Sequence, residues 1–91
     1  MIVTLNEMKK YLRVDFTDDN NLIKSLIETS EQMCEEILRV DSIEDYSENE
    51  NVRVAVMYTV AYLYEHREEA SHNELKLTLR AMLSSFRGEA F

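Results

Sequence analysis

The stretch Val54–Tyr64, VAVMYTVAYLY, decides the fold: it has eleven residues without a charge, a proline or a glycine. On a helix its apolar side chains point in all directions, and such a helix needs cover on every side. At about 1.5 Å per residue it spans about 16 Å, too short for a bilayer. The cover must therefore be protein, and the rest of a 91-residue chain can shield one side better than the other. Self-association is the first functional prediction.

The composition around this stretch predicts an all-α fold. The chain has one glycine, Gly88, and no proline, and it is rich in residues that favour helices. Its length allows one domain with a modest core. We expect a single domain over residues 1–91, a small bundle of two long antiparallel helices flanked by two short helices.

Capping signals and helical periodicity place the first half of the chain. Thr4 and Glu7 form a capping box that opens a short helix over residues 5–12. A connector follows, in which Phe16 is expected to enter the core. Residues 18–39 then form the most amphipathic helix, whose apolar side chains recur at helical spacing.

The second half begins with a polar loop over residues 40–51. Ser47 and Glu50 form a second possible capping box, which would open a helix running to about residue 69. Leu75 and Leu77 alternate as in an extended strap. A closing helical segment then carries apolar residues at helical spacing and ends at Gly88; these residues are Leu79, Met82, Leu83 and Phe86.

Acidic residues gather in the middle of the chain. The net charge is -8, and residues 18–50 hold eleven acids against two bases, while the flanking segments are nearly balanced. This charge argues against binding DNA or anionic membranes through their phosphates, which requires Lys and Arg. Four acids are predicted to lie on the solvated face of the second helix: Glu28, Glu31, Glu35 and Glu36.

Patterns for catalysis, metals or cofactors are missing from the sequence. A single glycine rules out a phosphate-binding loop, and no zinc motif occurs. His66 and His72 are interpreted as solvated residues at helix ends, and Cys34 as a small core residue. One cysteine and no secretory leader predict a reducing cytoplasm. We therefore expect no enzyme activity, metal, cofactor or small-molecule substrate.

Three tyrosines in the uncharged stretch point to an interface. Tyr58, Tyr62 and Tyr64 differ too much in direction for one packing face to hold all three, so at least one should contact a partner. Tyrosine is enriched in interfaces because it combines a large apolar area with a polar tip. The predicted subunit interface comprises Val54, Tyr58, Ala61 and Tyr62.

The order of several segments resembles a known family. The chain opens with VTLxExKxYLRVD at residues 3–15, continues through an acidic run and a repeat of Leu and Ile, and later reads AYLYEHRE at residues 61–68 and LRAMLSSFR at residues 79–87. Together these segments resemble the gp6-like head-tail connector proteins of tailed bacteriophages, also called DNA-packaging proteins. The resemblance covers nearly the whole chain.

This resemblance implies a non-catalytic subunit of a ring that lies below the portal protein in the virion neck, after assembly in the bacterial cytoplasm. The ring would continue the DNA channel without specific DNA binding and would contact neck or tail completion proteins. The acids at 28, 31, 35 and 36 are then expected at the lumen or rim, where they repel phosphates. The predicted portal contact comprises Arg80, Phe86, Arg87 and Phe91.

A second interpretation stays open. A small acidic helical protein can also act as a regulator that mimics DNA and occupies the basic groove of a nucleic-acid-binding protein. Such a mimic needs ordered surface acids and a fully covered core. A ring subunit instead needs apolar surface beyond its own core, so the exposure of the uncharged helix separates the two interpretations.

Overall fold

The computed structural model describes residues 1–66 and 72–84, and within these residues it contains four α-helices, one 3-10 helix and no strand. The elements are α1 (Leu5–Leu12), α2 (Asn20–Leu38), the 3-10 helix η1 (Ile43–Tyr46), α3 (Glu50–Glu65) and α4 (Asn73–Leu83). The predicted all-α fold is confirmed. The two longest helices, α2 and α3, are in contact, and the shorter α1 and α4 flank them.

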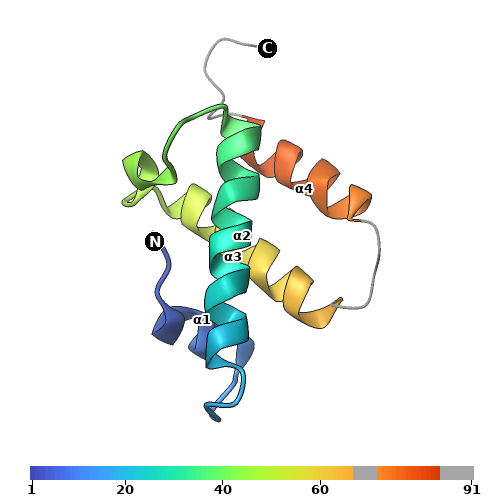
Figure 1. Cartoon of the computed structure of the whole chain (residues 1–91). Coiled ribbons are helices and arrows are strands. Elements are labelled where there is room, and N and C mark those ends of the chain that lie inside the picture. Colours follow the sequence, from blue (N-terminus) through green and yellow to red (C-terminus); the bar gives the residue numbers. More distant parts are fainter. Residues whose placement is uncertain (67–71, 85–91) are drawn as a thin grey trace.

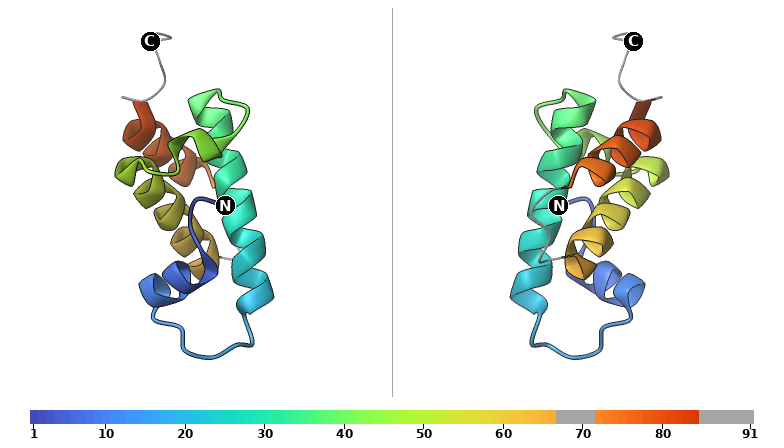
Figure 2. Two further views of the ribbon diagram at one scale, coloured as in Figure 1. Left: turned by 90° about the vertical axis from the view of Figure 1, so that its left-hand side faces the viewer. Right: turned by 90° about the vertical axis from the view of Figure 1, so that its right-hand side faces the viewer.

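Helix α2 forms the spine of the molecule (Figure 1). Helix α3 runs back across it obliquely, in the opposite overall direction. Helix α1 packs near the N-terminal end of α2, and α4 lies beside its C-terminal half, in contact with both α2 and α3. Figure 1 shows η1 and α4 on opposite sides of this spine, and the two side views in Figure 2 show α3 and α4 packed on one face of it.

The core lies where these helices meet. Each helix contributes residues at helical spacing, as expected for amphipathic elements, and the N-terminal residues Ile2 and Val3 close it from one side. The fully buried large side chains are Met8, Ile23, Ile27, Ile43, Leu75, Leu79, Leu83, Val3, Val52, Val56, Val60 and Thr59. The Thr59 hydroxyl donates a hydrogen bond to the Ala55 carbonyl at 2.8 Å, which satisfies this polar group within the core.

The ends of α1 follow from local chemistry. The Thr4 side chain accepts a hydrogen bond from the Glu7 amide at 3.1 Å, and the Glu7 carboxylate accepts one from the Thr4 amide at 3.0 Å, so the predicted capping box is confirmed. Both α1 and α2 end at a residue with left-handed backbone angles, Arg13 with φ 60° and Arg39 with φ 59°. Glycine is the usual residue at such a position, because a side chain disfavours this conformation.

Helix α3 begins and ends elsewhere than predicted. Its cap is Asn49, whose side-chain oxygen accepts a hydrogen bond from the Val52 amide at 3.2 Å. Ser47, the predicted cap, instead follows η1, and its amide donates to the Glu44 carbonyl. The helix ends at Glu65, and the backbone of the next residue, His66, is no longer helical. The predicted continuation over 67–69 lies outside the described residues.

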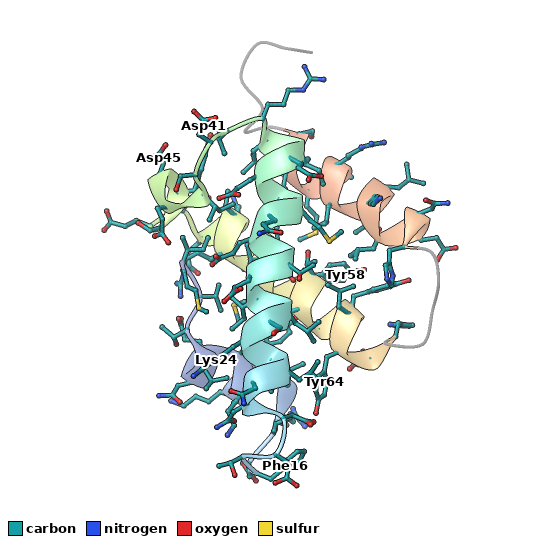
Figure 3. All side chains as sticks on the ribbon, viewed as in Figure 1. Phe16, Lys24, Asp41, Asp45, Tyr58 and Tyr64 are labelled. Carbon is teal, nitrogen blue, oxygen red and sulfur yellow. The ribbon has the colours of Figure 1, made fainter. Side chains whose placement is uncertain are left out.

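Two expectations about single segments are wrong. Leu75 and Leu77 belong to α4 and not to an extended strap: Leu75 is buried in the helical core face, whereas Leu77 is 63% exposed. Phe16 is not in the core, since it is 50% exposed at the tip of the connector between α1 and α2, far from η1 (Figure 3). Phe86 and Gly88 lie outside the described residues.

Candidate functional site

The outer face of α3 is only partly covered by the rest of the subunit. Its inner face is buried against α2 and α4. The predicted interface residues lie on the other side: Val54 is 47% exposed, and Tyr58, Ala61 and Tyr62 are half-buried. Their spacing of four, three and one residues places them on one face of a helix. The structure therefore brings all four predicted interface residues together.

This face continues into a shallow groove between the end of α1 and the C-terminal half of α3. The groove encloses about 630 Å³ and mixes aromatic, apolar and charged side chains. Its lining residues are Tyr11, Leu12, Arg13, Tyr58, Ala61, Tyr62, Glu65 and His66. Tyr11 is 49% exposed, so an aromatic side chain from α1 extends the surface of α3. The sequence did not single out Tyr11, because its contact with the α3 surface is long-range.

The tyrosines of α3 have different surroundings. The Tyr64 hydroxyl donates a hydrogen bond to the Asp19 carboxylate at 2.6 Å, which ties the end of α3 to the start of α2. The Tyr62 ring stacks on His66 with centroids 4.1 Å apart and meets the edge of His72 at 6.1 Å. Tyr58 is half-buried and lines the groove between α1 and α3. Contact of at least one tyrosine with a partner stays a prediction.

The four predicted surface acids of α2 separate into two pairs. Glu28 and Glu36 are exposed, as expected. Glu31 is buried, with 8% exposure, and its Oε2 accepts a hydrogen bond from the Ile2 amide at 2.7 Å. Burial raises the pKa of the Glu31 carboxyl above its usual value. Glu35 is half-buried, and its Oε2 accepts a hydrogen bond from the Ile43 amide at 2.8 Å.

The prediction that Glu31 is solvated is therefore wrong, and the helical pattern contains the reason. Glu31 comes four residues after Ile27 and three before Cys34, both of which are fully buried, so it lies on their line along α2. Its carboxylate is satisfied by the Ile2 amide of the N-terminal segment, and the Glu35 carboxylate is satisfied in the same way by the Ile43 amide of η1. Those long-range contacts are what the sequence could not show.

Arg53 is a structural residue that the sequence analysis did not identify. Its Nε donates to the Ile2 carbonyl at 3.2 Å, its Nη1 pairs with Glu50 at 2.9 Å, and its Nη2 pairs with Glu7. The hydrogen bond from the Thr4 amide and the Arg53 guanidinium together hold the pKa of the Glu7 carboxyl below its usual value. Arg53 thus joins α1, α3 and the N-terminal segment.

The predicted portal contact is described only in part. Arg80 is exposed on α4, whereas Phe86, Arg87 and Phe91 lie outside the described residues. Arg80 lines a groove of about 480 Å³ between α4 and the C-terminal half of α2. The other residues lining this groove are Met33, Glu36, Ile37, Arg39 and Lys76. Three of its lining residues are basic, in a molecule of net charge -8.

Among the described residues, no group or helix meets the requirements of a reactive cysteine nucleophile, a metal site or a membrane-spanning helix. Cys34 is fully buried in the core, and burial raises the pKa of its thiol to about 12, which makes it a packing residue and a poor nucleophile. Over residues 1–66 and 72–84, no cluster of His, Cys, Asp or Glu is arranged to hold a metal ion. No helix among the same residues is both long and apolar enough to span a bilayer.

These features define a small all-α protein in which the outer face of α3 is left partly exposed. The family model for phage gp6-like head-tail connector proteins matches residues 2–88, almost the full length. The chain belongs to this family, which consists of phage structural assembly proteins and not of enzymes, and which implies a location in the virion. No curated protein and no solved structure matched the chain.

Proposed function

We propose that copies of this chain form a ring below the portal protein, and that this ring continues the DNA channel towards the neck and tail completion proteins. A cyclic ring requires a heterologous interface, in which two different surfaces of each subunit meet. The outer face of α3, with Val54, Tyr58, Ala61 and Tyr62, supplies one of the two surfaces. The observation that carries this proposal is the 47% exposure of Val54, at the start of the uncharged stretch of α3.

The proposed lining of the channel follows from the acids that remain on the surface. Glu28 and Glu36 are exposed on α2 and would repel the phosphates of passing DNA, so that DNA moves without being bound. Glu31 and Glu35 are engaged by backbone amides and no longer belong to this surface. Without Glu31 and Glu35, fewer acids remain on the surface of α2 for the ordered acidic array that a DNA mimic requires. The interpretation as a DNA-mimicking regulator is therefore not favoured.

The C-terminal segment is the proposed contact with the portal protein. Arg80, Phe86, Arg87 and Phe91 combine positive charge with aromatic side chains near the C-terminal end of the chain. Deleting residues 88–91 should weaken binding to the purified portal protein and leave the helical content unchanged. Unchanged portal binding would contradict this part of the proposal.

The ring itself is tested by self-association. Sedimentation velocity across a range of concentrations should show oligomers, and Val54→Asp should shift them towards the monomer, because a charge would be buried in the interface. Phe16→Asp is the matched control, since Phe16 is 50% exposed but lies at the connector tip, away from α3. A wild-type protein that stays monomeric at millimolar concentration, or equal effects of both substitutions, would overturn the proposed interface.

A further inference from the structure

The groove between α2 and α4 concentrates positive charge. Arg39 ends α2, Lys76 and Arg80 lie one turn apart on α4, and Glu36 is the only acid among the described residues that line the groove. All three cations are exposed, and within the described residues none of them takes part in an ion pair. The half-buried Met33 and Ile37 add apolar surface to the lining. In a protein of net charge -8, this groove is suited to an acidic partner with some apolar character.

The complementary surface is the acidic segment formed by residues 41–50. It contains five acids and no base. Glu44 pairs with the amino group of Met1 and Glu50 pairs with Arg53, so these two charges are already neutralised. Asp41, Asp45 and Glu48 are exposed and form no ion pair in the part of the chain that the structure describes. Figure 3 shows Asp41 and Asp45 at the outer edge of the molecule.

The two charged surfaces lie on opposite sides of the same subunit. The acidic segment and α4 both flank the C-terminal half of α2, but η1 lies on one side and α4 on the other (Figure 1). The hydrogen bond from Ile43 to Glu35 and the ion pair of Met1 with Glu44 hold the acidic segment on its own side. Over the described residues, the acids of this segment form no ion pair with Arg39, Lys76 or Arg80 of their own chain.

We propose that the groove between α2 and α4 binds the acidic segment of a second copy of this chain, with Asp41, Asp45 and Glu48 facing Arg39, Lys76 and Arg80. This inference rests on the proposed ring and names the charged contact that fixes its direction. Because the two surfaces are on opposite sides, one neighbour occupies the groove and a different neighbour receives the acidic segment. Contacts of this type propagate from copy to copy and are heterologous.

The assignment also divides the roles of the C-terminal region. Arg80 contacts the neighbouring copy, and the portal contact is left to Phe86, Arg87 and Phe91. A lysine in the groove and carboxylates in the acidic segment provide a direct chemical test, because a carbodiimide joins such groups only when they are in contact. Mixing copies labelled with nitrogen-14 and nitrogen-15 distinguishes cross-links between copies from those within one copy.

The experiment reverses each charged surface. Asp41→Lys with Asp45→Lys, and separately Lys76→Glu with Arg80→Glu, should each weaken self-association by about tenfold or more, because like charges then face each other. Joining all four substitutions in one chain restores opposite charges and should bring the dissociation constant back to within about threefold of the wild type. Matched controls are Asp15→Lys with Asp18→Lys, and Lys9→Glu with Lys10→Glu, which change the net charge equally elsewhere.

The outcomes separate this inference from the proposed ring. Recovery in the fourfold variant, with mixed-label cross-links from Lys76 to the acidic segment, supports the contact. Oligomers that weaken on Val54→Asp but respond to the charge reversals no more than to the controls would overturn the contact and leave the ring standing. A protein that stays monomeric at millimolar concentration would overturn both.

Discussion

Replacing Glu31 by alanine removes a buried carboxylate that anchors the N-terminal segment to α2. The Ile2 amide, 2.7 Å from Glu31 Oε2 in a buried position, would lose its acceptor. A buried hydrogen bond to a charged group contributes about 1.5–3 kcal/mol, and the better helix propensity of alanine offsets up to about 0.5 kcal/mol. We expect a loss of about 2 kcal/mol in the free energy of unfolding, which lowers the Tm of a domain of this size by about 8–16 °C.

Thermal and urea unfolding followed by circular dichroism at 222 nm would measure this loss. Glu28→Ala is the control, since Glu28 is exposed on the same helix and its replacement should change stability by less than about 0.5 kcal/mol. Equal Tm values for Glu31→Ala and Glu28→Ala would refute the anchoring role.

The same carboxyl also predicts a pH dependence. Because burial raises the pKa of Glu31 in the folded state, the folded protein binds this proton more tightly than the unfolded chain. The contribution of this proton to stability is present at low pH and is lost as pH rises through the folded pKa. Glu31→Gln keeps an acceptor for the Ile2 amide without the charge, so it should reduce this pH dependence and cost less than Glu31→Ala. A larger loss for glutamine than for alanine would contradict the explanation.

Three further predictions concern single contacts. Thr4→Ala should lower the free energy of unfolding by about 1 kcal/mol through loss of the α1 cap, measured by urea denaturation, with a change below about 0.2 kcal/mol counting against it. The Cys34 thiol, with its pKa raised to about 12, should react with a disulfide reagent at pH 8 only as fast as the protein opens; immediate reaction of the native protein would contradict its burial. Because the pKa of the Glu7 carboxyl is lowered in the folded state, its ionised form stabilises the protein at pH values above its usual pKa, and this stability is lost as pH falls through the folded pKa. Arg53→Met should therefore destabilise the protein at pH 7 more than at pH 3. An equal shift in Tm at both pH values would exclude this linkage.

Local signals in the sequence predicted the helices well. The capping box at Thr4 and the apolar spacing along α2 depend on interactions between residues three or four apart, which a sequence displays directly. The exposed face of α3 was predicted for a related reason, since an uncharged helix has more apolar surface than a small bundle can cover. The start of α3 was harder, because Ser47 and Asn49 are both good capping residues; in the structure Ser47 ends η1 and Asn49 caps α3.

Contacts between distant segments explain what the sequence did not predict. Glu31 is buried because the N-terminal segment supplies a backbone amide, 29 residues away in the chain, that satisfies it. Phe16 is exposed because the connector loops away from the core, although its composition alone favoured burial. The basic groove joins Arg39 to Lys76 and Arg80, and only the packing of α4 beside α2 brings these residues together.

The left-handed backbone at Arg39 has an evolutionary consequence. A residue other than glycine in this conformation destabilises the folded state by about 1 kcal/mol relative to glycine. A substitution of Arg39 by glycine would therefore stabilise the fold. Such a change would also delete a guanidinium from the mouth of the groove next to α4. Selection for thermostability would then favour glycine at position 39, whereas selection for assembly would favour arginine. Libraries of variants screened only for heat resistance would tend to lose the arginine.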